Sequence, residues 1–341
     1  MSKFADIYGH EQIKEHLQNA IRLNKVSHAY IFNGPMGSGK KMTAGIFAET
    51  LQCERHGQEP CGTCHSCIQS ESGNQPDIIW VHHEKPGSIG VDDVREQVIG
   101  DMQIKPYSSR YKIYIIDEAE KLTQQAQNAL LKTIEEPPAY GIIILLTTNA
   151  DTFLQTILSR CVRLDFRPLR DTLVTQYLQE KYDLTDYECR FATAFAQGKI
   201  GRAVTIATSK EFAQLKEEVM HVIRYAKEMT TAEIMAEVKN IANYKLTIDD
   251  YLDLMAMWYR DVLVFKSTKD SNALIFKDEM SLLAEQAKNC SYEGLEDILK
   301  SIDKVKLRLK ANVNFDLVIE LLIMAIKEAL SLIHISEPTR L

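Results

Sequence analysis

Four of the seven cysteines lie within fifteen positions, with the spacing C-x7-C-x2-C-x2-C. They are Cys53, Cys61, Cys64 and Cys67. In a chain whose first ten residues show no secretory signal, such a cluster is typical of a metal site rather than of disulfides. Four thiolates complete the tetrahedral shell of Zn²⁺, so we expect a structural zinc with no open position for catalysis. Four free thiols in a surface loop are the alternative, and His56 and His65 are rival ligands that four thiolates make unnecessary.

A glycine-rich loop, GPMGSGK at 34–40, follows directly on the apolar run Ala29–Phe32 and precedes a helix expected over 41–51. A strand, a loop and a helix in this order form the context in which such a loop binds phosphate. Its backbone N–H groups close around phosphate oxygens, and Lys40 would bridge the β- and γ-phosphates. The nucleotide-binding residues expected here are Gly34, Gly37, Ser38, Gly39 and Lys40.

The residue after that lysine departs from the usual pattern. A Ser or Thr hydroxyl at this position ligates Mg²⁺, whereas this chain has Lys41, whose ammonium cannot ligate a cation. Thr43 lies two residues further along the helix and points elsewhere. The sequence therefore predicts a loop that holds phosphate but lacks one metal ligand, so that ATP with Mg²⁺ is a candidate cofactor while efficient hydrolysis is disfavoured. A vestigial loop kept only for its fold is the alternative.

Polar side chains follow two further apolar runs. The run YKIYII leads into Asp117 and Glu118. Asp117 would orient the waters of a metal, and Glu118 would polarise an attacking water. The run IIILL leads into Thr147, Thr148 and Asn149. Thr148 and Asn149 are candidates for sensing a γ-phosphate, and simple turn residues are an equal alternative.

Arg160 lies in the segment TILSRC at 156–161, after a helical turn. It is either an ordinary surface arginine or an arginine finger, a side chain that reaches the nucleotide of a neighbouring subunit and neutralises transition-state charge there.

The elements that must position these residues fall into two regions. Four apolar runs fit strands buried on both faces of a parallel sheet: Ala29–Phe32, Ile78–Val81, Tyr111–Ile116 and Ile142–Leu146. Helical patterns separate the runs, and one helix extends from a Thr123 cap to Pro137. From about residue 167 strand signals vanish, and long helices are expected over Glu211–Lys227, Leu252–Phe265 and Phe315–Leu330.

Composition narrows the class of protein. The 341 residues are 45% hydrophobic and 26% charged, as in an ordinary globular chain. The net charge of −7 disfavours strong DNA binding by this chain alone. The longest apolar run near the C-terminus, Leu321–Ile326, is far shorter than a membrane span. We therefore expect a soluble, cytoplasmic protein without membrane contact.

The chain resembles the clamp-loader branch of the AAA+ proteins. The resemblance lies in HAYIFNGPMGSGK at 28–40, IIDEAEKLTQQAQNALLKTIEEPP at 115–138 and ILSRC at 157–161. A four-cysteine module between the P-loop and the next strand is typical of the DNA polymerase III clamp loader of bacteria, and RLKANVN at 308–314 is similar to its collar helix.

The resemblance implies an α/β AAA+ P-loop fold, with helices on both faces of a parallel sheet, followed by a helical lid and an all-helical collar. The implied ranges are a nucleotide-binding domain at 1–167 with the zinc module at 53–67, a lid at 168–208 and a collar at 209–330. Residues 331–341 resemble a translated cloning tail and are left out of fold reasoning.

The implied function is to help open the sliding clamp and load it on primed DNA, in a hetero-pentamer with gamma/tau and delta subunits. Polymerisation itself would reside in another subunit of the holoenzyme. Three features favour the delta-prime type: Lys41, the displaced arginine Arg202 in GKIGR at 198–202, and the length. In that type Arg160 acts in trans, and the chain's own ATPase is weak or absent. A gamma/tau motor subunit with its own ATPase is the alternative.

Two unrelated classes are less favoured. A zinc-ribbon nucleic-acid binder would call for a basic patch with interleaved aromatic residues, which 53–85 lacks. A stand-alone P-loop kinase would need a substrate-binding lid that the helical half does not supply.

Overall fold

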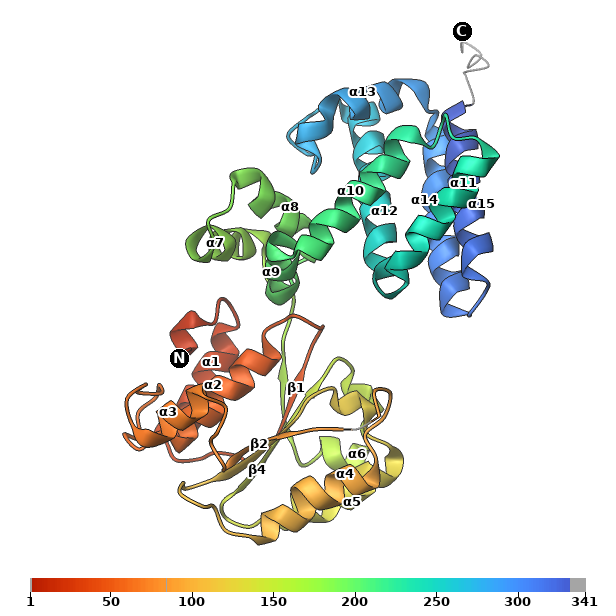
Figure 1. The fold of residues 1–341 in the computed structure, drawn as a ribbon. Helices are drawn as coiled ribbons and strands as arrows, with labels where there is room; N and C mark the ends of the chain where they lie inside the picture. The colour runs from red at the N-terminus through yellow and green to blue at the C-terminus, as the bar shows by residue number, and fades with distance from the viewer. Residues whose placement is uncertain (1, 84, 332–341) are drawn as a thin grey trace. The chain divides into compact units, whose positions relative to one another are not determined.

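The fold was obtained as a computed structural model that describes residues 2–83 and 85–331 (Figure 1). Of these residues, 2–184 and 196–204 form one compact unit, and 185–195 and 205–331 form a second. Each unit is considered separately below.

The first unit is built on a five-stranded parallel sheet with the order β2-β3-β4-β1-β5. Its strands are β1 Ala29–Asn33, β2 Ile78–Val81, β3 Lys112–Ile116, β4 Gly141–Thr147 and β5 Val162–Asp165. All residues of β3 and β4 are buried, as expected for the central strands of a sheet covered on both faces. Because the strands are parallel, their carboxyl ends meet at one edge, where the P-loop leaves β1.

Alternating side chains of β1, β2, β3 and β4 enter two separate cores, whereas β5 contributes Val162 and Leu164 to only one of them. Tyr30 and Phe32 of β1 pack with α1 and α2 on one face, whereas Ile31 packs with α4, α5 and α6 on the other. The helices of this unit are α1 Glu11–Arg22, α2 Lys40–Gln52, α3 His65–Glu71, α4 Val91–Val94, α5 Gln124–Glu135, α6 Gln155–Leu158 and α7 Asp171–Lys181. A π-helical segment, Arg95–Gly100, continues α4, and single 3-10 turns lie at Phe4–Asp6, Asp101–Gln103, Ala119–Lys121 and Ala150–Thr152.

The described residues of the second unit form helices and the loops that connect them, with no strand among them. Its helices are α8 Asp186–Ala196, α10 Lys210–Tyr225, α11 Thr231–Ile241, α12 Ile248–Thr268, α13 Met280–Asn289, α14 Tyr292–Lys310 and α15 Phe315–Ser331. Two 3-10 segments, Ala242–Thr247 and Lys277–Glu279, connect them. α9 Ile200–Thr208 has residues in both units, and so has α8, whose last residue Ala196 belongs to the first. In this unit α12 packs against α10, α13 and α14, and α14 packs against α15; Trp258 of α12 is fully buried.

The predicted fold class is confirmed: a parallel α/β sheet with helices on both faces precedes a helical region. The four predicted strands and the long helices lie where the sequence indicated, but β5 was missed. The three-domain division remains a prediction, and the structure distributes the predicted lid, 168–208, between its two units. Of the tail predicted at 331–341, Ser331 ends α15, and the rest lies outside the described residues. No helix within the described residues is long and apolar enough to cross a membrane.

Candidate functional site

The P-loop lies between β1 and α2, beside a cavity of about 510 Å³. Four of the residues predicted to bind nucleotide line this cavity: Gly37, Gly39, Lys40 and Thr148. Gly34 is packed against the backbone after β5, since a Cβ there would lie 2.3 Å from the carbonyl oxygen of Phe166. Ser38 is buried, and its carbonyl oxygen is 3.1 Å from Nε2 of His10. These two residues therefore shape the loop without lining the cavity.

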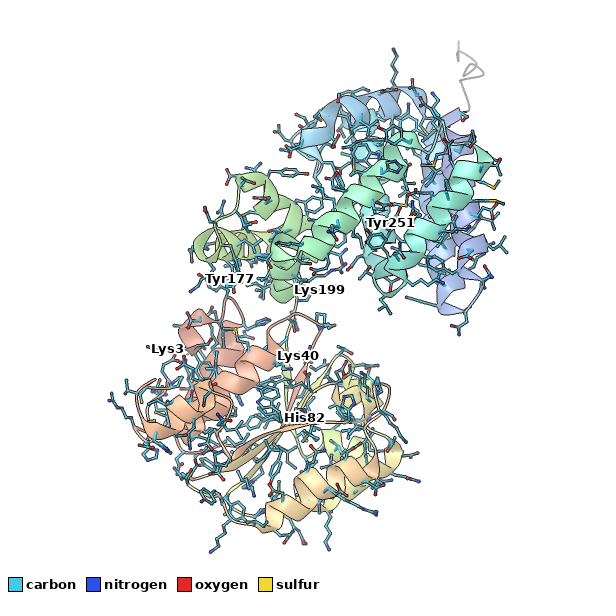
Figure 2. All side chains as sticks on the ribbon, viewed as in Figure 1. Lys3, Lys40, His82, Tyr177, Lys199 and Tyr251 are labelled. Atoms are coloured by element: carbon cyan, nitrogen blue, oxygen red, sulfur yellow. The ribbon has the colours of Figure 1, made fainter. Side chains whose placement is uncertain are left out.

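Lys40, labelled in Figure 2, is directed into its own loop. Its Nζ donates to the carbonyl oxygens of Gly34 at 2.6 Å and Pro35 at 2.8 Å. Burial lowers the pKa of Lys40, and the nearby carboxylates of Glu120 and Asp117 partly offset this effect. To contact a phosphate, Lys40 would have to exchange these loop carbonyls for phosphate oxygens.

Lys41 and Asp117 form an ion pair across the cavity mouth, with Nζ 3.2 Å from Oδ2. Asp117 follows β3 and Lys41 lies in the first turn of α2, so the parallel sheet brings the two together. The same ammonium lies 5.3 Å from the centre of the Trp80 ring on β2. The Thr43 hydroxyl, the nearest alternative metal ligand on α2, donates instead to the Gly39 carbonyl at 2.9 Å.

The remaining carboxylates of the cavity have donors of their own. Glu118 pairs with Lys121 at 2.7 Å and lies 3.7 Å from Nε2 of His83. Glu120, which the sequence analysis did not select, accepts the Thr148 hydroxyl at 2.7 Å and the Thr148 N–H at 3.2 Å. Burial alone would raise the pKa of Glu120, but these bonds from Thr148 hold it below its ordinary value.

Asn149 has a local structural role. Its side chain accepts the N–H of Asp151 at 3.0 Å and so caps the 3-10 turn Ala150–Thr152. It is not among the described residues that line the cavity. Of the two proposed phosphate sensors, Thr148 therefore faces the cavity and Asn149 fits the alternative of a turn residue.

Arg160 lies just after α6, with 41% of its side chain exposed. Its Nη2 is 3.0 Å from Oε1 of Glu135, the last residue of α5, and its Nη1 donates to the Thr156 carbonyl oxygen at 3.1 Å. The guanidinium is therefore oriented by two fixed groups yet remains accessible, which is compatible with contact to another chain.

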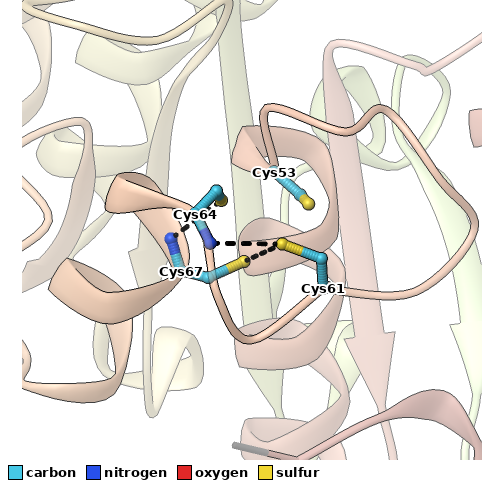
Figure 3. Close-up of side chains that lie close together, drawn as sticks. All are labelled: Cys53, Cys61, Cys64 and Cys67. Atoms are coloured by element: carbon cyan, nitrogen blue, oxygen red, sulfur yellow. Dashed lines mark hydrogen bonds between the residues drawn. The ribbon is translucent and has the colours of Figure 1, made fainter.

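The four predicted metal ligands converge in space (Figure 3). The sulfur atoms of Cys53, Cys61, Cys64 and Cys67 all lie within 4.8 Å of one another. Cys53 directly follows α2, Cys64 caps α3 and Cys67 lies within α3, so the ligands come from the ends of both helices and the loop between them. Backbone N–H groups of Thr63 and Cys64 donate to Cys61 Sγ at 3.5 and 3.3 Å, as expected around a thiolate ligand. The cluster could thus hold a metal ion.

The thiol pKa values reflect these surroundings. Hydrogen bonds from Thr63 lower the pKa of Cys61 to about 5, whereas burial raises the pKa of Cys67. Without a cation, four adjacent thiolates would repel one another, so a divalent ion would stabilise the deprotonated cluster. His56 and His65 lie outside the group of converging ligands.

Two family models match the chain. The model described as "DNA polymerase III, delta subunit" matches residues 9–170. The model described as "DNA polymerase III, delta subunit, C terminal" matches residues 210–328. Together they span most of both structural units.

Individual relatives fall into two subunit types. DNA polymerase III subunit delta' of Bacillus subtilis is 29% identical over 316 residues, covering 92% of this chain and 94% of that protein. Subunit tau of the same organism is 30% identical and covers 89% of this chain, which spans only 58% of tau. Subunit tau/gamma of Haemophilus influenzae is 38% identical over 60% of this chain and 30% of its own length. Among solved structures, a gamma subunit-related protein of Thermotoga maritima covers 92% of this chain and 99% of its own, with 20% identity and a TM-score of 0.49.

Proposed function

The chain belongs to the DNA polymerase III clamp-loader subunit family, and we propose that it is a delta-prime-type subunit that supports ATP hydrolysis by a neighbour. The observation that carries this proposal is the Lys41–Asp117 ion pair, because it engages both positions at which a hydrolytic site would hold Mg²⁺. The long match to a delta' subunit, over 94% of that protein, supports the same choice.

In this role the chain joins gamma/tau and delta subunits in a hetero-pentamer that opens the sliding clamp and loads it on primer–template DNA. The helical second unit would serve as the collar that holds the subunits together. Arg160 would complete the ATP site of the adjacent motor subunit, where its planar fork stabilises charge on the γ-phosphate. Its partial exposure and its orientation by Glu135 support this assignment.

The test is steady-state ATP turnover by the reconstituted complex with Arg160→Ala in this chain. One arginine finger contributes roughly 10³ to 10⁵ in rate at its own site. We therefore expect the complex to lose the contribution of one site and keep that of the sites with their own arginines. Arg160→Lys should restore little, because lysine lacks the planar fork.

Arg163→Ala is the matched control. Arg163 is also an exposed arginine of the first unit, and it pairs with Asp165 at 2.9 Å. Its loss should leave turnover unchanged, and a sizing run should show all complexes assembled. Equal turnover with Ala and Arg at position 160 would mean that the arginine is structural and that the trans-acting role is wrong.

A gamma/tau-type motor is the second candidate. It is favoured by the 38% identity to a tau/gamma subunit and by the presence of Lys40, Asp117 and Glu118 at the cavity. Sustained Mg²⁺-dependent ATP turnover by the isolated chain would favour this candidate over the delta-prime type.

We further propose that the metal held by Cys53, Cys61, Cys64 and Cys67 is zinc in a structural role. Four thiolates suit Zn²⁺ in its tetrahedral geometry and leave no position for a substrate. The sulfur positions and the N–H donors around Cys61 support this assignment.

A further inference from the structure

The donor set at the P-loop does not suit Mg²⁺. This ion requires near-octahedral oxygen ligands at about 2.0–2.1 Å. The position that would supply a hydroxyl is Lys41, and an ammonium has donors but no acceptor. The hydroxyl of Thr43 is buried and bonded to the Gly39 carbonyl, so α2 offers no replacement in its first turn.

Among the described residues, each carboxylate that lines the cavity already has a donor. Asp117 pairs with Lys41, Glu118 pairs with Lys121, and Glu120 accepts two hydrogen bonds from Thr148. A divalent ion would therefore have to share each carboxylate with the donor it already has, and at Asp117 it would lie close to the positive Lys41 ammonium. The site and the metal that the family implies do not fit each other.

The same arrangement can accept a polyphosphate anion although three carboxylates line the cavity, because Glu118 and Glu120 keep their donors Lys121 and Thr148 when Lys41 turns from Asp117 to the anion. Lys41 has 69% of its side chain exposed and lines the cavity, so its ammonium can exchange Asp117 for a phosphate oxygen. The first turn of α2 and the backbone of Gly37 and Gly39 border the same cavity, and a helix N-terminus favours anions. Lys41 thus stands beside Asp117, where a metal would otherwise supply positive charge.

We propose that this cavity binds a polyphosphate without any divalent cation, with the Lys41 ammonium in the place of Mg²⁺. The ligand class is a metal-free nucleoside di- or triphosphate, or an inorganic polyphosphate of similar charge. The proposal concerns the chain's own cavity and does not rest on its role as a clamp-loader subunit.

Equilibrium dialysis of labelled ATP against the isolated full-length chain tests this directly, once in EDTA and once in excess Mg²⁺. We expect the affinity in EDTA to equal or exceed that in Mg²⁺. Lys41→Thr should weaken binding in EDTA about tenfold, or ~1.4 kcal/mol, and should regain affinity when Mg²⁺ is added. Lys41→Arg keeps the charge and should keep binding in EDTA, and Lys25→Thr, a change at another exposed lysine, should have no effect.

Asp117→Asn gives a second test, because a metal-dependent site and the metal-free site proposed here predict opposite changes in affinity for ATP. At a metal-dependent site the loss of this carboxylate weakens binding, whereas here it releases Lys41 and removes a negative charge, so affinity in EDTA should rise. Competition by inorganic tripolyphosphate distinguishes a nucleotide site from a general polyphosphate site. Full displacement of ATP indicates recognition of phosphates alone, and partial displacement indicates that the nucleoside also contributes.

Three results would overturn the proposal. The first is absence of ATP binding to the wild-type chain in EDTA. The second is binding that requires Mg²⁺, and the third is a Lys41→Thr variant that binds ATP in EDTA as well as the wild type. Circular dichroism and thermal melting of each variant establish that a change in affinity does not come from unfolding.

Discussion

If the four cysteines bind zinc as proposed, replacing Cys64 by Ser should release it and loosen residues 53–71 while the sheet stays folded. The metal would join Cys53 to Cys67 and so close a segment of 15 residues. Cross-linking a loop of that length is worth about 3 kcal/mol through the entropy of the unfolded chain, and a metal clip acts in the same way. We therefore expect the free energy of unfolding of the first unit to fall by about 3 kcal/mol.

The loop also carries contacts that depend on its position. Glu59 accepts the N–H of Phe4 at 2.7 Å and the side-chain amide of Gln18 at 3.1 Å. If the loop loosens, these bonds weaken as well, each at a net cost of about 1 kcal/mol. The N-terminal segment and α1 should therefore respond to zinc loss, whereas β3 and β4, which are buried along their whole length at the centre of the sheet, should not.

Three measurements check this prediction. Metal analysis should find about one zinc per wild-type chain and almost none in the variant. Hydrogen exchange should quicken in 53–71 and near Phe4 but not in β3, and urea denaturation gives the loss of stability. Cys161→Ser, a change at a cysteine outside the cluster, should keep its zinc.

Two results would refute the reasoning. Wild-type protein purified without chelator and free of zinc would exclude the metal site. Faster exchange throughout β3 and β4 in the variant would mean that the module supports the whole unit, and that the estimate from loop closure is too small.

Two further predictions concern buried carboxylates. Burial raises the pKa of Glu237 above its ordinary value near 4.5, and the hydrogen bond from Asn240 and the nearby His221, 3.8 Å away, offset this only in part. The ionised carboxylate therefore lowers the free energy of unfolding as the pH rises above 4.5. Glu237→Gln should therefore stabilise the second unit by about 1 kcal/mol at pH 7 and hardly at all at a pH well below 4.5. Urea denaturation at both pH values measures this, and an equal increase in stability at the two would contradict the electrostatic cause. Asp77 accepts hydrogen bonds from the backbone N–H groups of Tyr107, Ser108 and Ser109 at 2.6 to 3.0 Å. Because each bond contributes about 1 kcal/mol, Asp77→Ala should destabilise the first unit by about 3 kcal/mol, and Asp77→Asn by about half as much. Denaturation curves of the two variants that coincide with the wild type would show that water replaces these bonds without cost.

The central strands could be predicted from the sequence because both of their faces are buried. Ile142–Leu146 is a continuous apolar run, and its shortness and its three isoleucines favour a buried strand over a buried helix. β5 was missed since it lies at the sheet edge and alternates apolar residues with Arg163 and Asp165. A short alternating segment with two charges carries too weak a strand signal to stand out.

The side-chain arrangements at the two sites could be predicted to different degrees. The cysteine cluster was found because its members are close in sequence as well as in space. The Lys41–Asp117 pair was not, because it joins α2 to the end of β3, and only the order of the strands brings them together. Glu120 was passed over in favour of Glu118, since nothing in the local sequence reveals that Glu120 faces Thr148.

The position of β5 also affects how the chain behaves at high concentration. An edge strand exposes unpaired backbone groups and can recruit a strand of another molecule, which is a common start of aggregation. β5 has only four residues, and its exposed Arg163 and Asp165 form a charged pair at 2.9 Å. A second chain approaching this edge would have to desolvate both charges, so β5 should resist strand pairing between molecules.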